Sequence, residues 1–153
     1  MKKILVAVSC ILLAAAVASA ADAKKASKPA APKLVAWPAA DIKWSDLPGT
    51  PGVQFCDLWG DHTKGAYGTL VKFPAGSEVP LHTHTNDMRT VVVSGTLIHT
   101  PEGKAGIRLG SGSYIKQPGH GYKHTTACDK ASECIIFTES AGAFDVLPVE
   151  AKK

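Results

Sequence analysis

The sequence predicts an all-β fold, a small barrel or sandwich built from short strands. Beyond Ala20, runs of apolar and β-branched residues alternate with clusters rich in Gly and Pro, which recur at roughly ten-residue spacing. No segment in this part has the 3.6-residue periodicity of an amphipathic helix. At 153 residues the chain has the length of one domain, expected at 34–148 with a short tail at 149–153.

Six segments have the composition of strands, because they are rich in Val, Ile, Thr and aromatic residues. They are Val53–Trp59, Ala66–Phe73, Met88–His99, Ile107–Leu109, Ser113–Gln117 and Cys134–Thr138. Turn-forming clusters bound them, for example at 48–52 and 101–103. The histidine-bearing segments around His82 and His124 are also expected to be extended.

The N-terminus has the features of a secretory signal peptide. Lys2 and Lys3 precede an apolar run at 4–17, and Ala18–Ala20 fits a cleavage site. We therefore predict a signal peptide at 1–20 and an exported mature protein, periplasmic or secreted. A retained membrane anchor is the alternative, although the run is short for a span.

Charge is unevenly distributed along the chain. Residues 21–33 are rich in Ala, Lys and Pro and predict a linker without fixed structure. From Leu34 onward, eleven basic residues face twelve acidic ones. A nearly neutral domain does not predict nucleic-acid binding. We expect a small-molecule partner instead. We also expect no stable membrane insertion once the signal peptide is removed.

Three cysteines remain after the predicted cleavage, in a compartment that permits disulfides. Cys128 and Cys134 flank a polar segment that resembles a hairpin turn, and we predict a disulfide between them, with two free thiols as the alternative. Cys56 is interpreted as a small buried core residue.

His82 and His84 are two residues apart, so a β-strand would project them from one face. Two such imidazoles can reach one metal ion at about 2.1 Å, and His124 offers a third ligand. An isolated pair of this kind also occurs by chance in surface strands. We expect His62 and His99 to face water. His120 is either a plain turn residue or a group beside the metal.

Two segments resemble the motifs of the cupin family. The first matches at Gly76, His82, His84 and Gly95, and the second at Gly112, Pro118, Gly121 and His124. Met88 stands where the family has an acidic ligand, Cys128 replaces an Asn, and one extra residue precedes Gly121. The resemblance implies a single cupin β-barrel, the double-stranded β-helix or jelly-roll architecture.

The resemblance also implies one divalent metal ion held by three histidines, with further coordination positions open. It implies that Met88 comes from the hairpin partner of the strand with His82 and His84, and that His124 comes from across the barrel. Without a carboxylate, Fe(II) is favoured, with Zn, Ni or Cu as alternatives. Met88 is a fourth ligand, which would favour Cu, or more simply a packing residue.

By analogy with cupins that use three histidines, we expect an Fe(II) dioxygenase acting on a small oxygen-rich substrate such as a β-diketone or an enediol. The alternative is a non-enzymatic metal-dependent binding or sensing domain, as in cupins attached to anti-sigma factors; loss of the metal is a third reading. Arg89 and Tyr122 could orient a ligand or be solvated strand residues, and the outer strands could form a homodimer.

Overall fold

The computed structural model describes residue 31 and residues 33–150. The predicted signal peptide, nearly all of the linker and the last residues of the tail lie outside this range. Contacts between residues group the described part of the chain from Ala36 onward into one compact unit. Within the described residues, no helix has the length and apolar character needed to cross a bilayer.

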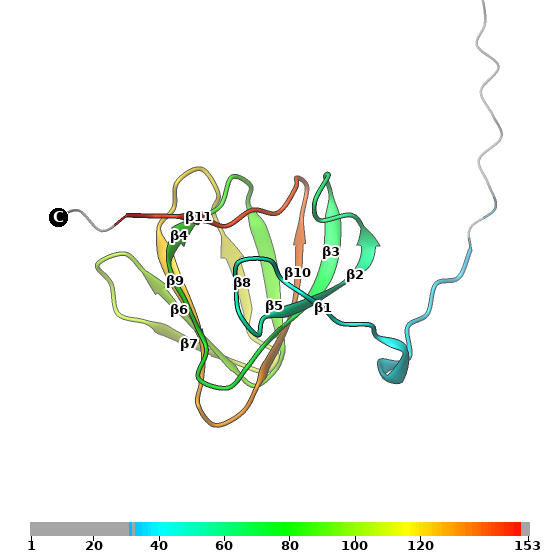
Figure 1. Ribbon diagram of the computed structural model, residues 1–153, viewed down its shortest axis with the longest axis horizontal. Helices are drawn as coiled ribbons and strands as arrows, with labels where there is room; N and C mark the ends of the chain where they lie inside the picture. Colours follow the sequence, from blue (N-terminus) through cyan, green and yellow to red (C-terminus); the bar gives the residue numbers. More distant parts are fainter. Residues whose placement is uncertain (1–30, 32, 151–153) are drawn as a thin grey trace, which may run out of the picture. The chain divides into compact units, whose positions relative to one another are not determined.

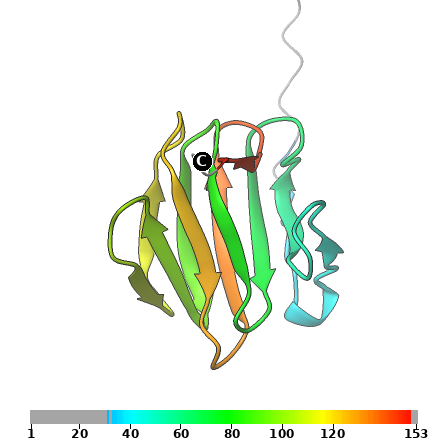
Figure 2. The same cartoon turned by 60° about the vertical axis from the view of Figure 1, so that its left-hand side comes forward.

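The domain consists of two antiparallel sheets, which confirms the predicted all-β fold (Figures 1 and 2). The first has the order β1-β2-β3-β10-β5-β8 and the second the order β11-β4-β9-β6-β7. The strands of the first sheet are β1 (Ser45–Asp46), β2 (Gln54–Gly60), β3 (Tyr67–Phe73), β10 (Cys134–Ser140), β5 (Met88–Ser94) and β8 (Tyr114–Gln117). Those of the second are β11 (Leu147–Pro148), β4 (Glu78–Thr83), β9 (His124–Cys128), β6 (Thr96–Pro101) and β7 (Ile107–Gly110). A single 3-10 turn, η1 (Ala39–Asp41), precedes them.

The core lies between the two sheets because strand residues alternate between the interior and the outer face. In β5, for example, Met88, Thr90 and Val92 are buried, whereas Arg89 and Val91 are exposed. The apolar part of the core combines residues of both sheets, including Val71, Phe73, Val92, Leu97, Cys128 and Ile136. The buried histidines described below do not belong to this apolar cluster.

One predicted strand is wrong. The segment Met88–His99 is two strands, β5 and β6, which belong to different sheets. Gly95 separates them with a φ of 76°, a left-handed conformation that glycine adopts without steric cost. Strand-forming residues continue on both sides of this corner, so composition alone did not reveal it.

The cysteine prediction is confirmed in its pairing and wrong in its setting. Cys128 and Cys134 are paired at disulfide distance, with Cα atoms 5.8 Å apart. The segment between them is not a hairpin turn, because β9 and β10 belong to different sheets. The pair therefore links the two sheets. Cys56 is free and buried, as expected for a core residue.

Replacing Gly95 is expected to destabilise the domain strongly. A Cβ atom there would clash with the backbone oxygen of Glu133 and lie 2.9 Å from the Cα atom of Cys134. We expect Gly95→Ala to lower the free energy of unfolding by about 2–4 kcal/mol in urea titrations. Gly112→Ala is the control, because Gly112 also has a positive φ but open space around its Cβ position. It should cost about 1–2 kcal/mol; equal losses in both variants would contradict the steric argument.

Candidate metal centre

Three histidines meet in the interior. His82 on β4 and His124 on β9 are direct partners across the two strands, and His84 follows β4 immediately. Their ring centroids are 4.2 Å apart for His82 and His124, 4.9 Å for His82 and His84, and 5.3 Å for His84 and His124. One nitrogen from each ring lies within 4.8 Å of the other two, and the cluster could hold a metal ion.

The strands that contribute these residues differ from those implied by the family resemblance. His124 comes from the strand next to β4 in the same sheet, and Met88 comes from β5 in the facing sheet. The reason is the strand order: β9 inserts between β4 and β6, while β5 lies between β10 and β8. The four side chains nevertheless all belong to buried residues.

Each of the three imidazoles is oriented by a backbone carbonyl. Nδ1 of His82 donates to the carbonyl of Pro80 at 2.6 Å, and Nδ1 of His124 donates to that of Tyr122 at 3.2 Å. Nδ1 of His84 donates to the carbonyl of Asp145. A carbonyl oxygen only accepts, so Nδ1 carries the proton and Nε2 keeps its lone pair. This is the tautomer that metal-binding histidines use.

Burial keeps these histidines neutral. His82, His84 and His124 are 3, 5 and 0% exposed. Burial lowers the pKa of His84 to about 4 and that of His124 to about 3, and it also lowers the pKa of His82. A divalent ion needs the neutral ring, so at neutral pH the site requires no proton release.

Nε2 of His124 is buried and has no hydrogen-bond partner among the described residues. Leaving such an atom unsatisfied costs about 1–3 kcal/mol. A metal ion would satisfy it, and among the described residues no carboxylate joins the three rings. Three neutral nitrogen donors fit Fe(II), Zn, Ni or Cu better than they fit Mg or Ca.

The segment that follows β10 fixes the position of His84. The backbone N–H of Thr85 donates to the Asp145 carboxylate at 2.8 Å, and the Thr85 hydroxyl donates to the same carboxylate. Nδ2 of Asn86 donates to the carbonyl of Ala143 at 2.9 Å. Phe144 lies between these contacts, with its ring centroid 5.6 Å from that of His84. Sequence reasoning missed Asp145, which is distant in the chain and belongs to no motif.

Met88 occupies the interior position where the family resemblance would place a carboxylate. Its sulfur accepts a hydrogen bond from the hydroxyl of Tyr67 at 3.5 Å, and both side chains are buried. Burial raises the pKa of Tyr67, so the hydroxyl remains a donor. The thioether is thus oriented by Tyr67, and whether it ligates a metal stays a prediction.

The expectation for His99 is wrong. This residue is 2% exposed, and its ring stacks on that of His124 with centroids 4.7 Å apart. Its Nε2 is hydrogen-bonded to the hydroxyl of Tyr122 at 3.1 Å. The position of His99 at the end of a predicted strand suggested that it faces water, whereas the alternation of β6 turns it inward.

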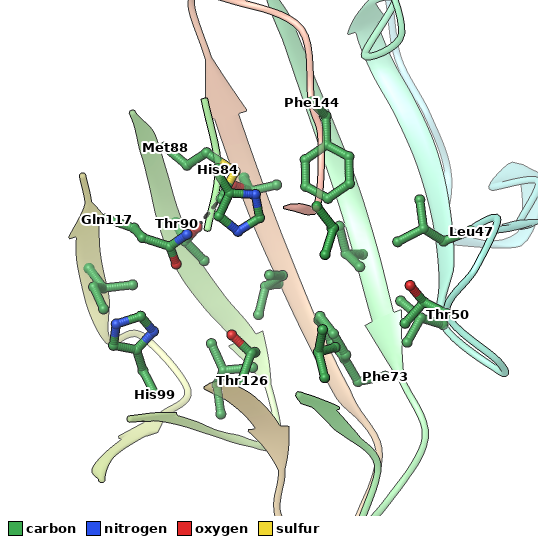
Figure 3. A pocket seen from close by; sticks show the side chains of 18 residues that line it. Leu47, Thr50, Phe73, His84, Met88, Thr90, His99, Gln117, Thr126 and Phe144 are labelled. Atoms are coloured by element: carbon green, nitrogen blue, oxygen red, sulfur yellow. Dashed lines mark hydrogen bonds between the residues drawn. The ribbon is translucent and has the colours of Figure 1, made fainter. Parts of the chain in front are cut away.

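A cavity of about 70 Å³ lies beside the histidines, between the sheets (Figure 3). Apolar side chains form most of its wall. The polar groups that line it include His84, His99, Thr90, Gln117 and Thr126, together with the sulfur of Met88. Nε2 of Gln117 is buried without a hydrogen-bond partner in the described part of the chain. No signal in the sequence marked Gln117, because glutamine in a strand is commonly solvated.

The remaining predicted residues lie apart from the three rings. His120 is exposed on the turn before β9, with a φ of 55°. Arg89 is on the outer face of β5, 3.8 Å from the Glu139 carboxylate, and does not face the cavity. Tyr122 does reach the site, since its ring stacks on those of His99 and His124.

His62 is also less exposed than expected. Its Nδ1 lies 2.8 Å from the Asp57 carboxylate, and its ring packs on Phe55. Asp57, Asp61 and His62 form a second group of possible metal ligands. Asp61 is paired with Lys64 at 2.6 Å. The other carboxylate oxygen of Asp57, Oδ1, is buried without a hydrogen-bond partner among the described residues.

Comparison with known proteins agrees with this architecture. Residues 33–143 match the family model described as the ChrR cupin-like domain. A polyketide cyclase, RemF from Streptomyces resistomycificus, superposes with a TM-score of 0.65 at 16% identity, over 79% of this chain and 89% of that one. KdgF from Halomonas sp. gives 0.54 at 26% identity, over 67% and 91%.

A third similar structure is Rhodobacter sphaeroides SigE in complex with the anti-sigma ChrR, with a TM-score of 0.53 at 26% identity, over 67% of this chain and 51% of that one. No curated protein matches the sequence. The family match extends over most of the chain and includes all three clustered histidines. This protein is therefore a cupin, and it belongs to the family of ChrR cupin-like domains.

Proposed function

We propose that this chain is an exported, metal-dependent enzyme of the dioxygenase type that acts on a small oxygen-rich molecule. His82, His84 and His124 hold one divalent metal ion, with Fe(II) favoured. The observation that carries the proposal is the buried cluster of three neutral imidazoles, in each of which Nδ1 donates to a carbonyl so that Nε2 keeps its lone pair. Export is supported by the predicted signal peptide and by the pairing of Cys128 with Cys134.

The residues of the site have separate roles in binding the metal and the substrate. The three imidazoles provide nitrogen ligands on one side of the metal ion. The carbonyls of Pro80, Tyr122 and Asp145 hold the rings in place. The apolar wall of the cavity excludes water from the bound molecule. A bound Fe(II) would supply the one-electron chemistry that dioxygen requires before it can react with an organic substrate.

A metal-dependent binding or sensing role is the second candidate. It is favoured by the family match, because the ChrR of the similar structure is an anti-sigma factor. The two functions differ in observable chemistry. An enzyme should hold a redox-active ion and consume oxygen with a diketone or an enediol, whereas a sensor could hold zinc and consume none.

The metal content of the purified protein tests the site. We expect wild-type protein, purified without chelator or a nickel column, to hold about one equivalent of metal by mass spectrometry. His84→Ala should reduce this content to less than about a tenth, because it removes one of three ligands. His120→Asn is the matched control, since His120 is exposed and Asn tolerates its positive φ. Full metal retention in His84→Ala would rule out the three-histidine site.

The role of Asp145 in orienting His84 can be tested separately. Asp145→Asn keeps the size of the side chain but weakens its hydrogen bonds to Thr85, which position the carbonyl that orients His84. We expect metal affinity to fall about 10-fold to 100-fold, as measured by competition with a chromogenic chelator. Asp129→Asn is the control, because that carboxylate pairs with Arg108 on the surface and should leave affinity unchanged. Equal affinities in wild type and Asp145→Asn would contradict the positioning role.

The buried histidines also predict how stability depends on pH. The pKa values of His84 and His124, about 4 and about 3, lie below the value of about 6.5 for an unfolded chain. Between these values the unfolded chain binds protons that the folded chain excludes, so unfolding becomes easier as the pH falls. We expect the free energy of unfolding of the metal-free protein to decrease from pH 6.5 to pH 5 in urea titrations.

His124→Gln should flatten this dependence, and His120→Asn should leave it unchanged, because His120 is exposed. A wild-type stability that is constant over the same range would mean that the histidines are not held neutral by burial.

A further inference from the structure

The carbonyl of Asp145, which orients His84, belongs to a segment without regular secondary structure. Residues 141–146 form neither a helix nor a strand, so contacts with neighbouring segments fix their path. Some of these contacts are the bonds to the segment of His84 described above. A further bond comes from Phe144, whose backbone N–H donates to the carbonyl of His62 at 2.7 Å. The turn between β2 and β3 that contains His62 therefore also supports this segment, at the same end of the domain (Figure 1).

Asp57 holds His62 in place. Its Oδ2 atom accepts two hydrogen bonds from His62, one from the backbone N–H at 3.2 Å and one from Nδ1 at 2.8 Å. The other oxygen, Oδ1, has no partner within residues 33–150. Asp57 lies where the register of β2 against β3 shifts, and an irregularity of this kind re-aims a side chain. Within the same range, the bonds of this carboxylate therefore serve to fix His62.

Ring packing connects His62 to the metal centre as well. The His62 ring packs edge-on against Phe55, with centroids 4.2 Å apart. The Phe144 ring lies 6.4 Å from that of His62 and 5.6 Å from that of His84 (Figure 3). Closely packed interiors transmit small displacements from one side chain to the next. A shift of His62 would therefore move both the backbone and the ring of Phe144 relative to His84.

We propose that Asp57 and His62 are positioning residues of the metal centre. Through Phe144 they fix the carbonyl of Asp145, which accepts the hydrogen bond from Nδ1 of His84, and in this way they set the affinity for the metal. Neither residue belongs to the cluster of three histidines, so they act through the segment after β10 and not on the ion itself. The proposal rests on the proposed function for the presence of the metal.

Two substitutions of His62 separate a positioning role from a merely structural one. His62→Phe keeps a ring against Phe55 but has no donor for Asp57, whereas His62→Asn loses the ring and keeps an amide N–H near the place of Nδ1. We expect His62→Phe to weaken metal affinity about 3-fold to 10-fold in competition with a chromogenic chelator, and His62→Asn to stay within about twofold of wild type. The melting temperatures of the metal-free variants should show the opposite order, because the buried ring stabilises the domain.

Lys64→Gln is the matched control, because Lys64 lies in the same turn, is exposed and pairs with Asp61. It should leave metal affinity unchanged. Asp145→Asn provides a second comparison. If His62 acts through Asp145, the two changes are not independent, and adding His62→Phe to Asp145→Asn should lower metal affinity by less than about twofold.

Metal affinity as weak in His62→Asn as in His62→Phe, or weaker, overturns the positioning role. Wild-type affinity in His62→Phe, or its full additional loss in the double variant, overturns it as well.

If wild-type protein binds no metal, the proposed function fails by itself, and amide hydrogen exchange of the metal-free protein then decides on the positioning role. The amide of Thr85 bonds to the Asp145 carboxylate. It should exchange at least about fivefold faster in His62→Phe than in wild type or His62→Asn. Equal exchange in wild type and His62→Phe overturns the proposal.

Discussion

Three imidazoles buried in the interior impose conditions that the rest of this domain satisfies. Each ring must remain neutral, and each must direct one nitrogen toward the other two. Burial lowers the pKa of all three, so neutrality follows from their depth in the barrel. The direction of each ring follows from a backbone carbonyl that takes the Nδ1 proton.

These carbonyls come from places that the fold has to bring together. Those of Pro80 and Tyr122 are two residues from the histidine they orient, so the local path of the chain supplies them. That of Asp145 is 61 residues from His84, and it depends on the segment after β10 crossing the end of β4. The bonds between Thr85 and Asp145 fix this crossing, and β11 pairs with β4 directly after it.

The interior combines two environments that have different physical origins. The apolar cluster around Val92 and Leu97 provides the burial that holds the sheets together. His84, His99, Gln117 and several threonines line the cavity together with apolar residues, and these polar groups need specific partners. The hydroxyls of Thr90 and Thr138 bond to each other, whereas Nε2 of His124 and Nε2 of Gln117 have no hydrogen-bond partner in the described part of the chain. Buried atoms of this kind are rarely left unpaired, and an ion such as the proposed metal would satisfy that of His124.

The sequence by itself determined the fold class, the pairing of Cys128 with Cys134, and the three histidines that cluster. Strand composition, turn residues and a two-residue spacing are local properties, and they are visible without the structure. The corner at Gly95 is local too, but strand-forming residues continue on both sides and concealed it. Only the tertiary structure decided which strands are neighbours, because pairing brings together segments that are distant in the chain. For that reason His124 lies beside His82 within one sheet, His99 turns inward, and Asp145 and Gln117 reach the site.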